Sequence, residues 1–133
     1  MIVVDASVLL AAEDADDAHH DASQQLFEAG LPLATLDLAF YEVTNVAEVV
    51  WRDRAAGERL RQRVSLISTY GTLVRVDRLL ADAAASVVHE FGISAYDAGY
   101  VAAARLLEAT LASCDVRDLV DNGLAVLPEH LVA

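Results

Sequence analysis

The chain has 133 residues, enough for one domain and too few for two, so we expect a single domain over residues 1–133. An apolar share of 56% and a mean hydropathy of +0.37 exclude an intrinsically disordered chain. The lone cysteine, Cys114, excludes a disulfide framework. A net charge of −12 excludes a basic coat that binds nucleic acid, so chemistry on phosphates would need metal ions to reverse the local sign.

The sequence predicts a cytoplasmic protein with no membrane contact. Its first residues carry no basic segment typical of a secretory signal peptide, and no apolar run approaches the roughly 20 residues that span a bilayer. All nine basic residues are arginines. A GC-rich genome would explain the missing lysines but not the surplus of aspartates, so we favour a protein adapted to a salty cytoplasm, as in a halophilic archaeon.

Short strands and helices alternate in the first part of the chain. Residues 2–4 form a β-branched run typical of a buried strand, and a helical pattern begins after Asp5. The next predicted elements are an acidic loop at 13–17, a helix over 18–29 and a strand over 33–36. Asp37 is predicted to cap a long helix that ends near Arg52, because apolar residues recur there at helical spacing.

The same alternation continues to the end of the chain. Gly57 interrupts the helical pattern, so we expect a new helix to follow it. The later predicted elements are a helix over 58–68, a strand over 73–76, helices over 78–90 and 95–108, a strand over 111–113, a short helix to 121 and a last strand over 125–127. This order predicts an α/β domain of three layers, α/β/α, around a mainly parallel sheet of four or five strands.

Four acidic residues stand where they can share one edge of that sheet. Asp5 and Asp115 follow predicted strands at opposite ends of the chain, and the carboxyl ends of parallel strands are where ligands gather in open α/β sheets. Asp97 lies in the first turn of one predicted helix, and Glu42 lies near the start of another. Clustered carboxylates are the ligands that Mg²⁺ and Mn²⁺ prefer.

Each of these acids, taken alone, also has a simpler explanation. Asp5 and Asp115 suit helix caps, Asp97 complements a helix dipole, and Glu42 suits a solvated helix surface. The prediction of a metal site therefore rests on their joint placement.

The segments around these acids resemble the motifs of the PIN-domain family of metal-dependent nucleases, especially VapC-type toxins of toxin–antitoxin pairs. Segment 2–9 is similar to the family's first motif, a strand followed by Asp and a hydroxyl residue two positions later. Segment 40–46 is similar to the second, a helical Glu with Asn three residues on, and segment 92–104 to the third, with Tyr-Asp-Ala at a helix start. Segment 111–115 resembles the fourth, although Ser113-Cys114 replaces the commoner threonine-containing pair.

This resemblance implies a three-layer PIN-like fold and an endoribonuclease that uses Mg²⁺ or Mn²⁺. It implies Asp5 and Asp97 as metal ligands, Asp115 as the acid that completes the site, and Glu42 as the holder of a metal-bound water or second ion. Asp118, a second acid near Asp115, leaves open which of the two faces the metal. The supporting residues that orient these acids would be Ser7, Asn45, Ser94 and Ser113.

Five of the nine arginines fall within residues 52–63, which carry a net charge of +3. They are Arg52, Arg54, Arg59, Arg61 and Arg63. They are equally well explained as a rim that contacts RNA phosphates beside the acidic site and as a solvated helical face.

The resemblance also implies partners: an RNA substrate, a homodimer, and a small VapB-like antitoxin that presents a basic side chain to the acidic pocket. One alternative is a non-catalytic α/β interaction protein whose acids serve only solubility in salt. A phosphatase with an acidic pocket, or a nuclease acting on DNA flaps, is a further alternative. The approach of the four acids to one another discriminates the nuclease from an interaction protein.

Overall fold

The computed structural model describes residues 1–132. Four strands form one sheet: β1 (Ile2–Val4), β2 (Leu33–Leu36), β3 (Thr72–Val74) and β4 (Thr110–Ala112). Their order is β3-β2-β1-β4 and every pair is parallel. The predicted α/β class and parallel sheet are confirmed.

A fifth strand over residues 125–127 was expected and does not form. Within residues 1–132, this segment adds a single bridge, in which Val126 pairs with Ala112 in parallel orientation. Pro128, which has no backbone N–H for a ladder, starts the short helix η3 (Pro128–His130) directly afterwards. The sheet therefore has four strands.

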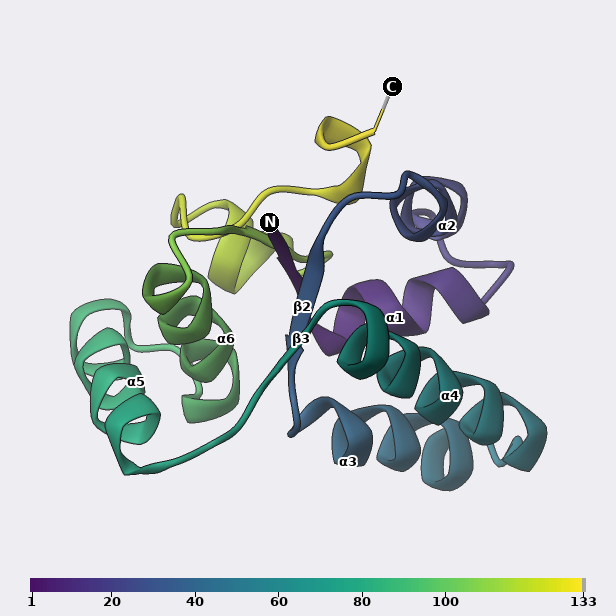
Figure 1. Ribbon diagram of the computed structural model, residues 1–133, viewed down its shortest axis with the longest axis horizontal. Coiled ribbons are helices and arrows are strands. Elements are labelled where there is room, and N and C mark those ends of the chain that lie inside the picture. Colours follow the sequence, from purple (N-terminus) through teal and green to yellow (C-terminus); the bar gives the residue numbers. More distant parts are fainter. Residues whose placement is uncertain (133) are drawn as a thin grey trace.

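Helices cover both faces of the sheet because the strand side chains alternate between two cores (Figure 1). Val3 points into the core under α5 (Arg78–Phe91) and α6 (Ala95–Leu106). Ile2 and Val4 point to the opposite core. The helices of that second core are α1 (Ala6–Glu13), α2 (His20–Glu28), α3 (Ala39–Thr44) and α4 (Arg54–Tyr70). The three-layer architecture predicted from the sequence is thereby confirmed.

The long helix predicted from Asp37 to Arg52 is wrong at its start and in its regularity. It begins at Ala39 as α3, and from Asn45 to Val50 it continues as a π-helical segment, η1. Asp37 does not cap it, because its carboxylate accepts a hydrogen bond from the backbone N–H of Val76, 3.2 Å away. Asp37 therefore ties the end of β2 to the chain beyond β3.

Gly57 does not interrupt a helix, contrary to expectation. Asp53 caps α4 by accepting a hydrogen bond from the N–H of Ala56 at 3.0 Å, and the helix runs through Gly57 to Tyr70. A Cβ atom on Gly57 would lie 2.8 Å from Cγ of Glu48. The glycine thus serves the close packing of η1 on α4.

Among residues 1–132, no helix combines the length and the apolarity needed to cross a bilayer.

Candidate metal centre

The strand order brings the two ends of the chain to one edge of the sheet. Strands β1 and β4 are parallel neighbours, with Val4 in register with Ala112. Asp5 follows β1, and its backbone N–H donates to the carbonyl of Ala112 at 3.3 Å. Asp115 comes three residues after Ala112, so both acids emerge at the same carboxyl edge.

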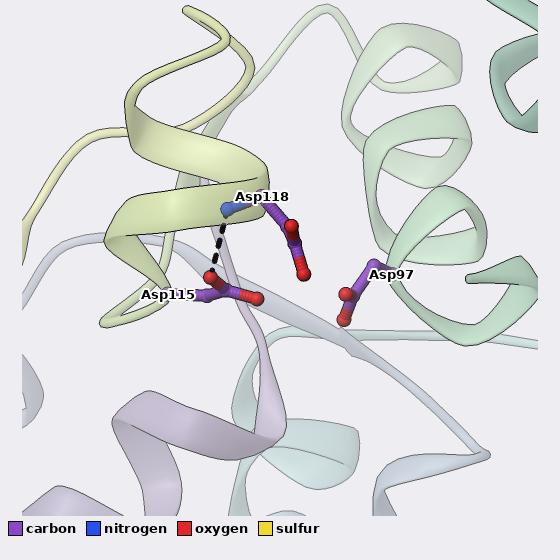
Figure 2. A group of neighbouring side chains, drawn as sticks. All are labelled: Asp97, Asp115 and Asp118. Atoms are coloured by element: carbon purple, nitrogen blue, oxygen red, sulfur yellow. Dashed lines mark hydrogen bonds between the residues drawn. The ribbon is translucent and has the colours of Figure 1, made fainter. Parts of the chain in front are cut away.

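Three half-buried aspartates meet at this edge: Asp97, Asp115 and Asp118 (Figure 2). Each offers a carboxylate oxygen that lies within 4.8 Å of those of the other two. Asp97 comes from the first turn of α6, while Asp115 precedes and Asp118 lies within the π-helical segment η2 (Val116–Val120). Asp115 and Asp118 are thus both part of the group.

The group fits a hard divalent cation by the chemistry of its donors. It holds carboxylate oxygens from separate elements, the ligand type that Mg²⁺ and Mn²⁺ favour. Burial raises the pKa of Asp97, and the neighbouring charges of Asp115 and Asp118 raise it further. A bound cation would relieve this mutual repulsion.

Asp5 lies outside the group of three and is almost fully buried, with 4% of its surface exposed. Its Oδ1 accepts hydrogen bonds from the Ser7 hydroxyl at 2.5 Å and the Val8 N–H at 3.2 Å, so it caps α1. Burial raises the pKa of Asp5 to about 6, with a smaller contribution from the charge of Asp97. Asp5 is therefore a helix cap whose pKa is also raised by the charge of Asp97.

Hydroxyl groups connect the two strand ends beneath the acids. The Ser7 Oγ accepts a hydrogen bond from the N–H of Cys114 at 2.8 Å and lies 3.4 Å from the Ser113 Oγ. Ser113 accepts from the N–H of Asp115 at 3.0 Å. Ser94 is different, since its hydroxyl caps α6 by accepting from the N–H of Asp97 at 3.1 Å. Hydrogen bonding by Ser113 and Ser7 lowers the pKa of Asp5 against the effect of burial, and hydrogen bonding by Ser94 does the same for Asp97, so all three hydroxyls act on the acids of this edge.

Glu42 also lies outside the group of three, in the first turn of α3. Burial raises its pKa, and the charge of Asp97 adds to the rise. Its Oε1 accepts a hydrogen bond of 2.7 Å from the hydroxyl of Tyr100, a residue that the sequence did not single out. The signal was present, because Tyr100 follows Asp97 by three positions and so shares its helix face.

Asn45, expected to support Glu42, is exposed and makes no side-chain hydrogen bond within the described part of the chain. The bond that holds Glu42 comes from Tyr100 instead.

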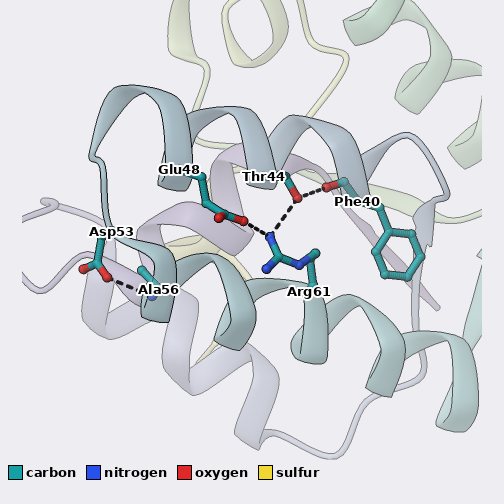
Figure 3. A network of polar contacts seen from close by, with 6 residues as sticks. All are labelled: Phe40, Thr44, Glu48, Asp53, Ala56 and Arg61. Carbon is teal, nitrogen blue, oxygen red and sulfur yellow. Dashed lines mark hydrogen bonds and ion pairs between the residues drawn. The ribbon is translucent and has the colours of Figure 1, made fainter.

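Three of the five clustered arginines are occupied by protein groups. Arg61 pairs with Glu48 and donates to the Thr44 hydroxyl at 3.2 Å (Figure 3). Arg59 pairs with Glu13. Arg63 lies over the Phe27 ring, 4.7 Å from its centre. The remaining two, Arg52 and Arg54, are exposed, and residues 1–132 offer them no ion pair.

Comparison with known families gives one match that covers most of the chain. The model of the PIN domain matches residues 2–121. No curated protein matches the sequence.

Solved structures of similar fold span nearly the whole chain. A toxin–antitoxin complex from Klebsiella pneumoniae aligns at a TM-score of 0.74 with 19% identity, covering 96% of this chain and 98% of that one. VapC20 from Mycobacterium tuberculosis, a toxin that cleaves the Sarcin-Ricin loop, aligns at 0.69 with 22% identity, covering 88% and 92%. A protein from Pyrobaculum aerophilum aligns at 0.70 with 27% identity, covering 98% and 85%. At such identities the likeness establishes a common fold.

Proposed function

The chain belongs to the PIN domain family, and from that premise we propose that it is a metal-dependent endoribonuclease, the toxin of a type II toxin–antitoxin pair. The observation that carries this proposal is the convergence of Asp97, Asp115 and Asp118 at the carboxyl edge of the sheet. The solved toxin–antitoxin complex of the same fold supports it, as does a relative in fold that cleaves the Sarcin-Ricin loop.

In this proposal the three clustered aspartates hold Mg²⁺ or Mn²⁺, with Asp5 and Glu42 beside them. A bound cation neutralises charge on the phosphate and lowers the pKa of an attacking water. Ser7 keeps the Asp5 carboxylate in one orientation through its 2.5 Å hydrogen bond. The carboxylates supply the negative charge that holds the ion.

Contacts to the RNA backbone would come from the free members of the arginine cluster. We assign this role to Arg52 and Arg54, which are exposed and close to each other in the chain. Arg59, Arg61 and Arg63 are committed to Glu13, Glu48 and Phe27, so they are less available to phosphates.

The proposed toxin is a single cytoplasmic domain over residues 1–133 that forms a homodimer and is inhibited by an antitoxin. An antitoxin with a basic side chain would complement the acidic edge of the sheet. The toxin–antitoxin complex from Klebsiella pneumoniae, which shares the fold, supports pairing with an antitoxin.

The test is cleavage of RNA by the purified protein with and without Mn²⁺. We expect cleavage that requires the ion, and a loss of at least about 100-fold in Asp97→Asn and Asp118→Asn, because each removes a negative ligand. Asp121→Asn is the matched control, since this exposed acid lies outside the group and should leave the rate unchanged. RNA cleavage that persists in Asp97→Asn, or that is unchanged when a chelator removes the metal ion, would contradict the proposal.

A further inference from the structure

The hydroxyl of Tyr100 donates a hydrogen bond to Glu42 and so joins helices on opposite faces of the sheet. Tyr100 is one of the largest fully buried side chains, with 1% of its surface exposed. Buried phenols usually need a hydrogen-bond partner, and here the partner is a carboxylate on another helix rather than a backbone carbonyl. The bond links α6, on one face of the sheet, to α3, on the other.

Glu42 depends on this hydroxyl for its orientation. Within residues 1–132, its carboxylate makes no other hydrogen bond, and the bond occupies Oε1. The Tyr100 hydroxyl lies 2.7 Å from Oε1 of Glu42, so this single donor holds the carboxylate on one side and leaves Oε2 without a hydrogen bond among the described residues. Asp97 and Tyr100 lie on the same face of α6, which places the donor one turn below the acidic group.

We infer that Tyr100 is a positioning residue, whose hydroxyl fixes Oε1 of Glu42 and leaves Oε2 to serve the metal centre formed with Asp97. This inference rests on the proposed function, because it requires that a divalent cation binds at this edge. Tyr100 touches neither substrate nor metal and acts through Glu42.

The test measures binding of Mn²⁺ alone to the full chain, by calorimetry and by electron paramagnetic resonance, without RNA. Tyr100→Phe removes only the hydroxyl, and we expect the affinity for Mn²⁺ to fall about 10-fold, at the low end of the range for groups that orient ligands. In a Glu42→Gln background the same change should have no further effect, since the carboxylate it orients is gone. Tyr70→Phe is the control, because that hydroxyl is exposed and distant in sequence from every acid of the centre.

A merely structural role predicts a different result. It would lower the unfolding temperature of Tyr100→Phe but leave Mn²⁺ affinity at the wild-type value, and that outcome overturns the inference. If Tyr100→Phe does not fold, Glu42→Asp serves instead, because it keeps the charge and withdraws the carboxylate from the hydroxyl. We then expect a similar loss of affinity with Tyr100 intact, and wild-type affinity would overturn the inference.

Failure of the inference and failure of the proposed function give distinct results. If the wild-type chain binds no Mn²⁺, the proposed metal centre falls and the inference falls with it. If the wild type binds Mn²⁺, Asp97→Asn loses it and Tyr100→Phe keeps it, only the role of Tyr100 is overturned.

Discussion

Asp5 shows how one residue serves both the fold and the proposed chemistry. Its carboxylate caps α1 through the Val8 N–H, and burial raises its pKa to about 6. A solvated cap would hold its charge at little cost, whereas this one is kept beside the acidic group without a cationic partner among the described residues. Burial of a charged Asp5 therefore costs stability, as expected of a residue that is kept for the proposed metal centre rather than for the cap alone.

The cost has a predictable pH dependence. Between its ordinary pKa of 3.8 and about 6, Asp5 in the folded protein retains a proton that the unfolded chain has released. The free energy of unfolding therefore falls as pH rises through this window and is not recovered above it. Asn carries no such proton, so Asp5→Asn should match the wild type near pH 4 and be more stable by roughly 2–3 kcal/mol at pH 7.

Urea unfolding in the presence of chelator, at several pH values, measures this difference. Asp121→Asn should track the wild type throughout, because Asp121 is exposed. A stability gain in Asp5→Asn that is the same at pH 4 and pH 7 would contradict a burial effect on Asp5.

Other residues of the site show what one-dimensional patterns miss. Two of the four expected acids, Asp97 and Asp115, come together with Asp118, whereas Asp5 and Glu42 lie outside that group. The contact of Tyr100 with Glu42 depends on how α6 and α3 meet in space, which periodicity alone does not specify. The structure also divides the acids, since Asp5 is turned toward the N-terminus of α1.

The arginines of α4 show, at the scale of an element, that a sequence pattern does not specify which neighbours a side chain meets. Successive helix residues are separated by about 100°, so residues two apart point to nearly opposite sides. Arg61 therefore faces η1, while Arg59 and Arg63 face α1 and α2 through Glu13 and Phe27. A sequence count of positive charge predicted one basic face, but the helix distributes the three side chains over two sides.

The packing of η1 on α4 explains why Gly57 lies within a helix. Glu48 extends across Gly57, and its carboxylate is held by Arg61 (Figure 3). From the sequence alone, Gly57 is predicted to break the helix. The reason for a glycine at this position is its contact with Glu48, which belongs to another element and cannot be seen in the sequence of α4. The π-helical geometry of η1 has no sequence signal that we recognise.

Because Glu48 packs on Gly57, the effect of Gly57→Ala on stability should change sign when Glu48 is replaced. Gly57→Ala should destabilise the wild type by about 1 kcal/mol, because the new Cβ displaces Glu48 from Arg61. In a Glu48→Ala background the obstruction is gone, and the better helix propensity of alanine should stabilise the protein by up to about 1 kcal/mol. Urea unfolding of the four variants measures the reversal.

An additive result would contradict the packing argument. If Gly57→Ala changes stability equally in both backgrounds, then Glu48 does not occupy the space above the glycine.

At the scale of the molecule, the α/β class was readable because short apolar strands alternate with helices along the chain. The strand order β3-β2-β1-β4 could not be predicted from the sequence. This order places β1 beside β4 and so brings Asp5 to the same edge as Asp115. The expected convergence relied on a general property of parallel sheets rather than on that order. The last strand failed because residues 125–127 lead straight into Pro128, which leaves room for one bridge only.

Net charge is the remaining property of the whole molecule, and it predicts how salt affects stability. Nine arginines cannot neutralise 21 acids, so the folded chain keeps a net charge of −12 and repulsion among its carboxylates outweighs attraction on average. Raising KCl from about 0.1 M to about 1 M shortens the screening length from about 10 Å to about 3 Å, which weakens this repulsion in the compact state. We expect the unfolding temperature at pH 7 to rise with KCl, by several degrees over this range.

Near pH 4.4, where the chain's net charge approaches zero, the same salt should have little effect. The comparison separates screening from the general effect of salt on hydrophobic burial, which acts at both pH values. An equal rise at pH 7 and pH 4.4 would assign the effect to burial and leave the excess of acids without a role in tolerance to salt.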